Sequence, residues 1–130
     1  MNSELITRSI YQHLVTWEHY DKTKVAIDNI NFETPKDGGL WYWVTVQHGI
    51  NLMVGMADKP CTRELGAVVI QIFTPANKST LDAIQKADSL GSHFQYHRIG
   101  KLEFLTASVI NVPERENGYQ INVRIPYRYN

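Results

Sequence analysis

The chain has 130 residues and a mass of 15.0 kDa, which suits a single domain. Thirteen basic residues balance thirteen acidic ones, and this balance excludes the basic excess of a protein that wraps nucleic acid. The single cysteine, Cys61, excludes an internal disulfide and a cysteine-based zinc site, and it indicates a reducing compartment.

The first predicted element is an amphipathic helix from Ser3 to about Tyr20. Its apolar stripe repeats at helical spacing and consists of Ile6, Ile10, Leu14 and Trp17. We expect Ser3 to be the N-cap and the stripe to pack on the core rather than on a partner. A short strand, Val25–Ile27, follows, and then a loop from Asn29 to Gly39.

Leu40 to Gln47 is rich in aromatic and β-branched residues and predicts a central strand. Trp41 and Trp43 share one face of it and could stack on bases or sugars. Because no basic residue lies beside them, we favour burial under a helix or a neighbouring subunit. The next strand, Leu65 to Thr74, is almost continuously apolar, which indicates the interior of the sheet.

The segment between these two strands, Ile50 to Thr62, is predicted to be a long apolar loop. Its apolar residues include Leu52, Met53, Val54 and Met56. A connection of this length between strands is usually functional, so we expect it to become ordered against a partner. The alternative is a β-hairpin that extends the flanking strands.

A second amphipathic helix is predicted after residue 80. Its stripe consists of Leu81, Ile84, Ala87 and Leu90. Gly91 is the expected end of this helix. The segment from His93 to Ile99 has no clear type, Leu102 to Val112 predicts a strand, and Pro113–Gly118 predicts a hairpin turn.

The last strand, Tyr119 to Tyr129, has the clearest period of two in the chain. Apolar side chains, among them Val123, alternate with polar ones such as Arg124 and Arg128, so one face must lie on a core. Because Pro126 cannot donate a hydrogen bond, we expect the strand to leave the sheet or to form its edge there. The predicted fold is α+β, a mainly antiparallel four- to five-stranded sheet with two amphipathic helices packed on one face.

No motif in the sequence predicts catalysis, a cofactor or a metal. His93 and His97 have a suggestive spacing, but two ligands do not make a zinc site, and we expect ordinary surface or capping histidines. A small hydrolase or metal enzyme built on these two residues is one alternative. A nucleic-acid-binding module built on Trp41 and Trp43 is another, although zero net charge argues against it. No signal peptide and no membrane span are recognisable, so we expect a soluble protein made in the cytoplasm.

Six pieces of the chain, in this order, carry a resemblance to a known family. They are the N-terminal helix with Trp17 near its end, the segment Ile27–Pro35, the aromatic strand, the run Arg63–Pro75, a helix of the right length after it, and the closing run Val123–Arg128. Together they resemble the phage tail terminators, the small proteins that cap the tube of long non-contractile, siphophage-type tails such as lambda-like ones. The pairing of Asn-x-x-Phe-x-x-Pro with a terminal Ile-Pro-Tyr-Arg is the most specific part.

The resemblance implies a structural virion protein and not an enzyme. It implies a homo-oligomer, a hexameric ring that stops tube polymerisation at the head-proximal end of the tail and allows head joining. Its partners would be the tail tube protein and the head-completion (stopper) protein, with DNA passing through the lumen without specific binding and no membrane involved. The protein would be made in the host cytoplasm, and another tail or neck ring component, such as a tube protein, is the alternative. We expect the subunit or tube interface to include Leu52, Met53, Val54, Met56, Arg124 and Arg128.

Overall fold

The computed structural model describes residues 2–27, 40–54, 61–75, 81–115 and 118–130. The predicted loop from Asn29 to Gly39 lies outside these ranges. The elements, in chain order, are α1 (Ser3–Val15), the 3-10 turn η1 (Lys22–Lys24), β1 (Val25–Ile27), β2 (Trp41–Val54), β3 (Cys61–Pro75), α2 (Leu81–Phe94), β4 (Arg98–Ile99), β5 (Leu102–Phe104), β6 (Ser108–Arg115) and β7 (Gly118–Tyr129).

The described strands form one mixed sheet of seven strands in the order β1-β2-β3-β7-β5-β4, and β6 also pairs with β7. Only β1 runs parallel to its neighbour; the other described pairs are antiparallel. The predicted α+β class with two helices is therefore confirmed. The sheet has more strands than the four or five predicted, because the two-residue strand β4 was not predicted and the predicted strand from Leu102 to Val112 is divided into β5 and β6.

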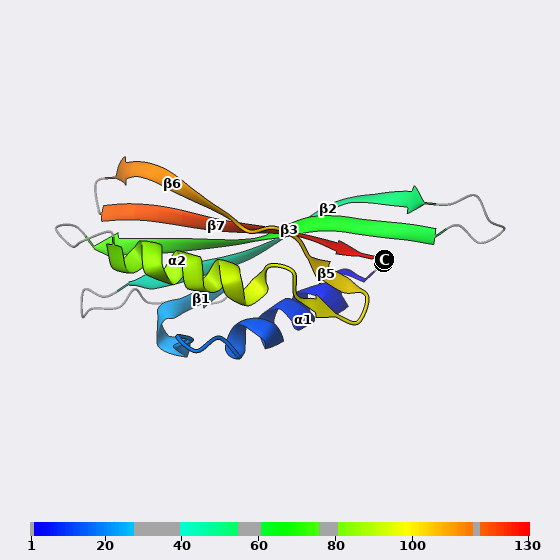
Figure 1. The fold of residues 1–130 in the computed structure, drawn as a ribbon, viewed down its shortest axis with the longest axis horizontal. Coiled ribbons are helices and arrows are strands. Elements are labelled where there is room, and N and C mark those ends of the chain that lie inside the picture. The colour runs from blue at the N-terminus through cyan, green and yellow to red at the C-terminus, as the bar shows by residue number, and fades with distance from the viewer. Residues whose placement is uncertain (1, 28–39, 55–60, 76–80, 116–117) are drawn as a thin grey trace.

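Both helices lie on the same face of the sheet (Figure 1). Cross-strand partners Val44, Ile70 and Val123 point into the layer between the helices and the sheet, and each is at most 1% exposed. The predicted stripe of α1 packs there too, with Ile6, Ile10, Leu14 and Trp17 all buried. The period of two in β7 follows from this arrangement, because Ile121, Val123, Ile125 and Tyr127 are buried on the same side.

The last strand is central and does not form an edge. It pairs with β3 along its whole length and with β5 and β6 on its other side. Pro126 lies opposite Ala67, and its carbonyl accepts a hydrogen bond from the Leu105 N–H at 2.8 Å. The proposed edge at Pro126 is therefore wrong, because a proline without an N–H still offers its carbonyl to a neighbour.

Three predictions about the helix ends also differ from the structure. The first helix ends at Val15 and not at about Tyr20. Asn2, not Ser3, precedes the first helical residue, and its own side chain makes no capping bond. Gly91 does not end α2, which continues to Phe94. Gly91 is buried, and a Cβ placed on it would lie 3.3 Å from that of Ala107, so the absence of a side chain allows α2 to pack closely on the chain after β5.

The predicted strand from Leu102 to Val112 is two strands, β5 and β6, with residues 105–107 between them. Both run along the same edge of β7. The predicted hairpin into the last strand is confirmed, since Arg115 pairs with Gly118.

The predicted loop from Ile50 to Thr62 is largely a hairpin, which was the alternative. Residues 51–54 of β2 pair with residues 61–64 of β3 after a bulge between His48 and Asn51. Gly49 lies in this bulge, and a Cβ there would come within 2.5 Å of the Leu65 carbonyl oxygen. We call residues 51–54 and 61–64 the arm; it extends beyond the helix layer at one end of the molecule (Figure 1).

Candidate assembly surface

The second face of the sheet turns away from both helices, and we call it the open face. One cross-strand row on it consists of Trp43, Gln71, Asn122 and Ile110. Trp43 is 41% exposed and Ile110 is 47% exposed. The two exposed apolar side chains stand at the ends of this row, with the polar Gln71 and Asn122 between them.

The two predicted tryptophans both lie on the open face. Trp41 stacks on Phe73 of β3, with ring centroids 4.1 Å apart and ring planes 16° apart. Neither helix can cover them, because both helices pack on the opposite face of the sheet. Burial under a helix, one of the two predicted kinds of cover, is therefore wrong, and cover by a neighbouring subunit stays a prediction.

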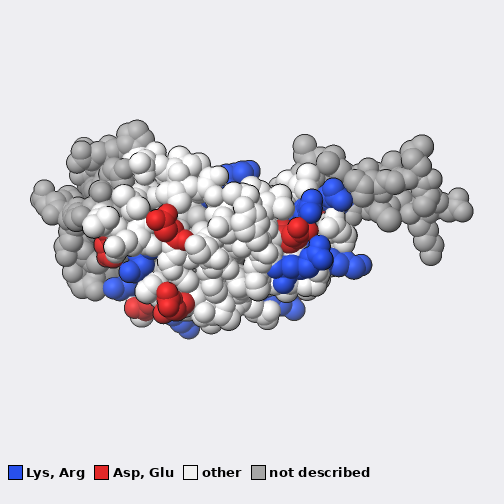
Figure 2. Space-filling model, in the orientation of Figure 1, with Lys and Arg blue, Asp and Glu red and all other residues white. Residues whose placement is uncertain are grey.

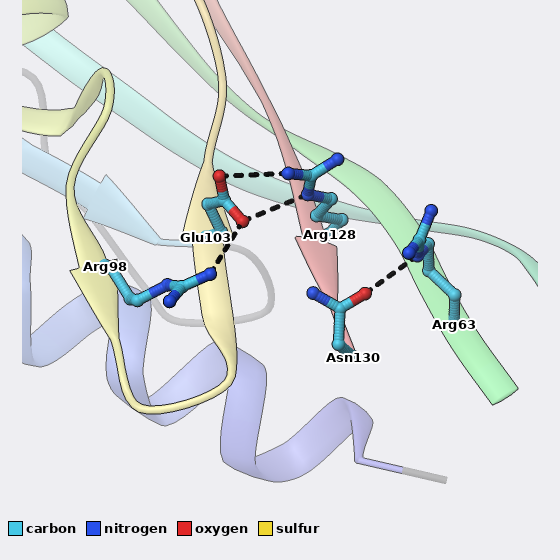
Figure 3. Close-up of polar contacts among 5 residues, drawn as sticks. All are labelled: Arg63, Arg98, Glu103, Arg128 and Asn130. Atoms are coloured by element: carbon cyan, nitrogen blue, oxygen red, sulfur yellow. Dashed lines mark hydrogen bonds and ion pairs between the residues drawn. The ribbon is translucent and has the colours of Figure 1, made fainter. Parts of the chain in front are cut away.

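Four arginines gather on the open face, and Figure 3 shows two of them, Arg98 and Arg128, beside one carboxylate. Arg128 of β7 donates to both oxygens of Glu103, from Nε at 3.0 Å and from a terminal nitrogen at 3.1 Å. Arg98 of β4 donates to the same carboxylate at 3.1 Å. These bonds from Arg128 and then from Arg98 hold the pKa of Glu103 below its usual value.

The other two arginines have no carboxylate partner among the described residues. Arg63 of β3 donates through Nε to the side-chain oxygen of Asn130 at 2.7 Å. Arg124 of β7 is exposed and lies opposite Val69 and Ser108. Figure 2 shows Lys and Arg side chains gathered at the end of the molecule near the arm. A chain that is neutral overall therefore carries a basic region.

A groove of about 450 Å³ crosses the open face at the base of the arm. Its apolar floor is formed by Leu65, Ala67, Leu105 and Pro126, and its polar rim by Gln47 and Arg124. Ala67 and Pro126 lie opposite each other on β3 and β7. Because these two side chains are short, the face is hollow here between larger neighbours.

The structure separates the predicted interface residues into two groups. Arg124 and Arg128 lie on the open face, four residues apart on β7. Leu52, Met53 and Val54 belong to the end of β2 within the arm, and Met56 lies outside the described residues. The groove itself was missed by sequence analysis, because it depends on the pairing of β3 with β7, which brings distant parts of the chain together.

Three of the histidines form a stack that was not predicted. His13 of α1 lies between His93 and His97, with ring centroids 4.0 Å and 4.1 Å away. The His13 Nε2 is 2.7 Å from the His93 carbonyl oxygen, and the His93 Nε2 is 2.8 Å from that of His13. The stack joins the ends of the two helices. No cluster of metal-binding side chains occurs in the described part of the chain.

A second set of hydrogen bonds joins α1 to the base of the arm. His48 of β2 is 3.1 Å from the Thr7 hydroxyl through Nε2 and 3.0 Å from the Tyr127 hydroxyl through Nδ1. Burial, and then the charge of Glu64, raises the pKa of Tyr127 to about 12. The ring of Tyr127 also covers Gly66, where an added Cβ would lie 2.5 Å from it. The base of the arm is therefore fixed to the body of the domain.

The fold and its exposed face define a small α+β protein with a surface suited to contacting other macromolecules. Among the described residues, no helix has the length and apolarity needed to cross a membrane. A family model described as phage tail terminator protein matches residues 5–127. The chain therefore belongs to the phage tail terminator family, a family of structural tail proteins and not of enzymes, and the resemblance seen in the sequence is confirmed.

Comparison with known structures supports the fold. One solved structure, of a protein known only by a sequence identifier, aligns over 100% of this chain and 96% of its own length. The TM-score is 0.73 and the sequence identity is 18%, so the likeness concerns the fold alone. None of the curated proteins matches the chain.

Proposed function

We propose that this protein terminates the tube of a long non-contractile phage tail as a closed homo-hexameric ring. The observation that carries the proposal is the family match over residues 5–127, which includes both helices and nearly the whole sheet. In this role the ring stops polymerisation of the tail tube protein and sits at the head-proximal end of the tail. Its other side is then available to the head-completion (stopper) protein.

The surfaces of the subunit suit such an assembly. The open face has exposed apolar and basic side chains, and the arm extends from the body with Leu52, Met53 and Val54 in its sequence. These two regions supply the subunit and tube contacts, with Met56, Arg124 and Arg128 among them. DNA passes through the lumen without specific binding.

Deletion of the gene tests the proposal directly. A phage that lacks the protein is expected to make tails whose tubes are longer than normal and which do not join heads, as seen by electron microscopy. Supplying the intact gene from a plasmid should restore both tail length and head joining. Tails that are absent altogether would instead indicate a tube component, and tails of normal length joined to heads would contradict the proposal.

A second measurement concerns the ring itself. Light scattering and negative-stain microscopy of capped tubes should show six copies at one end of each tube. A tube that binds the protein along its whole length would exclude the role of a cap.

A further inference from the structure

We propose that four basic side chains at the arm end of the open face bind the phosphate backbone of double-stranded DNA without reading its sequence. The residues are Arg63, Arg98, Lys101 and Arg128, and we call them the basic patch. The inference rests on the proposed function for the source of the DNA, which is the molecule that passes through the ring. In that ring, the contact places the basic patch of each subunit at the lumen.

Two of the four cations are held in place by one carboxylate. Glu103 of β5 lies between Arg98 of β4 and Arg128 of β7 and accepts hydrogen bonds from both (Figure 3). Arg128 uses Nε and one terminal nitrogen for these bonds, so its other terminal nitrogen has no partner among the described residues. Because both guanidinium groups are already oriented, less side-chain entropy is lost when an anion binds them.

The other two cations continue the patch beside the end of β7. Arg63 of β3 donates to the side chain of Asn130, and the main-chain N–H of Asn130 donates to the Lys101 carbonyl at 3.2 Å. Lys101 is exposed, and in the described part of the chain neither Lys101 nor Arg63 has a carboxylate partner. The four cations therefore form one continuous surface, at the end of the molecule where Figure 2 shows Lys and Arg side chains gathered.

The basic patch gives a neutral chain a strong local charge. Among the described residues, its four basic side chains stand against the carboxylate of Glu103, so the side chains carry a net charge of +3. Glu64, which follows Arg63 on β3, is buried on the helix side of the sheet and is bound to Asn2. The positive excess therefore acts on the open face, where a polyanion can meet it.

The composition of the patch favours DNA over an acidic protein as the partner. The cores of protein–protein interfaces are depleted of charged side chains, whereas surfaces that bind DNA are polar and strongly positive. The exposed Trp43 and Ile110 lie in the row of Asn122, six residues before Arg128 on β7. That is a separation of about 20 Å along the strand. The apolar and the basic ends of the open face are thus different surfaces.

The width of the basic patch fits the spacing of phosphates. Its residues lie on β3, β7 and β4 and in the turn between β4 and β5, so it covers three strand spacings, or about 15 Å. One DNA strand carries a phosphate for about every 3.4 Å of helix axis. A duplex that crosses the patch therefore presents about four phosphates of one strand to four cations. Contacts of this kind position DNA but carry no sequence information.

DNA titration of the purified protein tests the inference. Fluorescence anisotropy would follow two labelled duplexes of about 20 base pairs and unrelated sequence, between about 20 and 200 mM salt. Both duplexes should bind equally well. The logarithm of the association constant should fall with the logarithm of the salt concentration at a slope of about −3 for each bound subunit, because three net charges release counterions. A slope near zero, or a clear preference for one duplex, would contradict the inference.

Neutral substitutions locate the binding surface. Arg63→Gln, Arg98→Gln and Lys101→Gln should each weaken binding of both duplexes roughly tenfold at low salt and make the salt slope shallower by about one. Arg63→Lys keeps the charge and should bind nearly as well as the native protein. The matched control, Lys22→Gln, changes an exposed cation on the turn η1 and should alter neither quantity. Equal effects of Lys22→Gln and Lys101→Gln would overturn the proposed patch.

Binding to protein is the outcome that competes with this one. The same three neutral variants would be mixed with purified tail tubes, after thermal melts have shown that each is folded. Variants that lose DNA but still cap tubes at the normal length support the inference. Variants that bind DNA like the native protein and no longer bind tubes would assign the patch to a protein contact instead.

The two proposals can fail separately. If the native protein binds neither duplex while tails that lack it grow too long, the DNA inference is wrong and the proposed function stands. If DNA binding follows the expected salt slope but tails without the protein have normal length and join heads, the basic patch stands and the proposed function is wrong.

Discussion

Glu64 is a charged side chain that the fold buries to 5% exposure. Its two oxygens accept hydrogen bonds from the main-chain N–H of Asn2 at 2.9 Å and from the side-chain amide of Asn2 at 3.0 Å. Asn2 immediately precedes α1, so the carboxylate also meets the positive end of the helix dipole. A residue of β3 therefore anchors the N-terminal end of α1.

Replacing Glu64 by alanine should lower the free energy of unfolding by about 1–3 kcal/mol, since two N–H groups lose a charged acceptor. Chemical denaturation measures the change. Glu4→Ala, which removes an exposed carboxylate paired with Arg8 on the same helix, should change stability by less than about 0.5 kcal/mol. Equal effects of the two substitutions would show that Glu64 does not anchor the helix.

The stack of three histidines should make stability depend on pH. Burial lowers the pKa of His13 below its usual value of 6.5, and the nearby His93 and His97 add to this effect, against a hydrogen bond from the His13 ring to the His93 carbonyl that raises the pKa. The folded protein therefore binds fewer protons at His13 than the unfolded chain does. Stability from this residue is fully present above about pH 6.5 and is lost as the pH falls through the window below it.

Thermal unfolding between pH 7 and pH 5 checks this expectation. The melting temperature should fall with pH, and His13→Gln should make the dependence shallower. The matched control is His19→Gln, which removes an exposed histidine near Glu18 and should leave the slope unchanged. A slope that survives in His13→Gln would assign the pH dependence to other groups.

At the scale of elements, β7 contributes most to the core. Four of its side chains are at most 1% exposed: Ile121, Val123, Ile125 and Tyr127. It also joins the two halves of the sheet, since β3 lies on one side of it and β5 and β6 on the other. A substitution that loosens the packing of this strand should therefore lower the stability of the whole domain.

The variant Ile125→Ala should cost about 2–5 kcal/mol of unfolding free energy, because it leaves a cavity in a closely packed layer. Ile110→Ala, on the exposed side of β6, removes the same number of carbon atoms from a side chain that is 47% exposed, and its cost should stay below about 1 kcal/mol. Denaturant melts of the two variants compare them directly, and similar losses would contradict a one-sided core.

Sequence patterns predicted the parts of the fold that depend on neighbours in the chain. The stripe through Ile6, Ile10 and Leu14 and the alternation in β7 identified the buried faces correctly, because periodicity records which side of an element meets the core. The central place of β7 was missed because strand order depends on residues far apart in sequence. The continuation of β2 past Gly49 was only the alternative, because a strand that passes through a bulge does not keep one regular alternation.

For the candidate site, too, the sequence predicted individual residues but not the contacts between them. The sequence pointed to Arg124 and Arg128 and to the apolar run at residues 52–54. It did not reveal that Glu103 holds Arg128 while Arg124 has no described acidic partner. Nor did zero net charge reveal the basic region, because a sum over the chain carries no information about where the charges lie.

At the scale of the whole molecule, folding and assembly should use different residues. Replacing Leu52, Met53 and Met56 together by serine should leave the melting temperature of the free subunit nearly unchanged. Tails assembled with this variant should be uncapped, too long or unable to join heads, as measured by electron microscopy. Should the variant unfold instead, these residues belong to the core of the subunit and not to an interface.

The pairing of β3 with β7 also has a consequence for the rate of folding. The centre of the sheet joins the middle of the sequence to its last strand, and α2, β4, β5 and β6 must be accommodated between the two. Sheets built from such distant pairings fold in about milliseconds to seconds, far more slowly than helical bundles. Until β7 arrives, β3 keeps an unpaired apolar edge, so a chain that is still being synthesised is open to wrong partners and to aggregation.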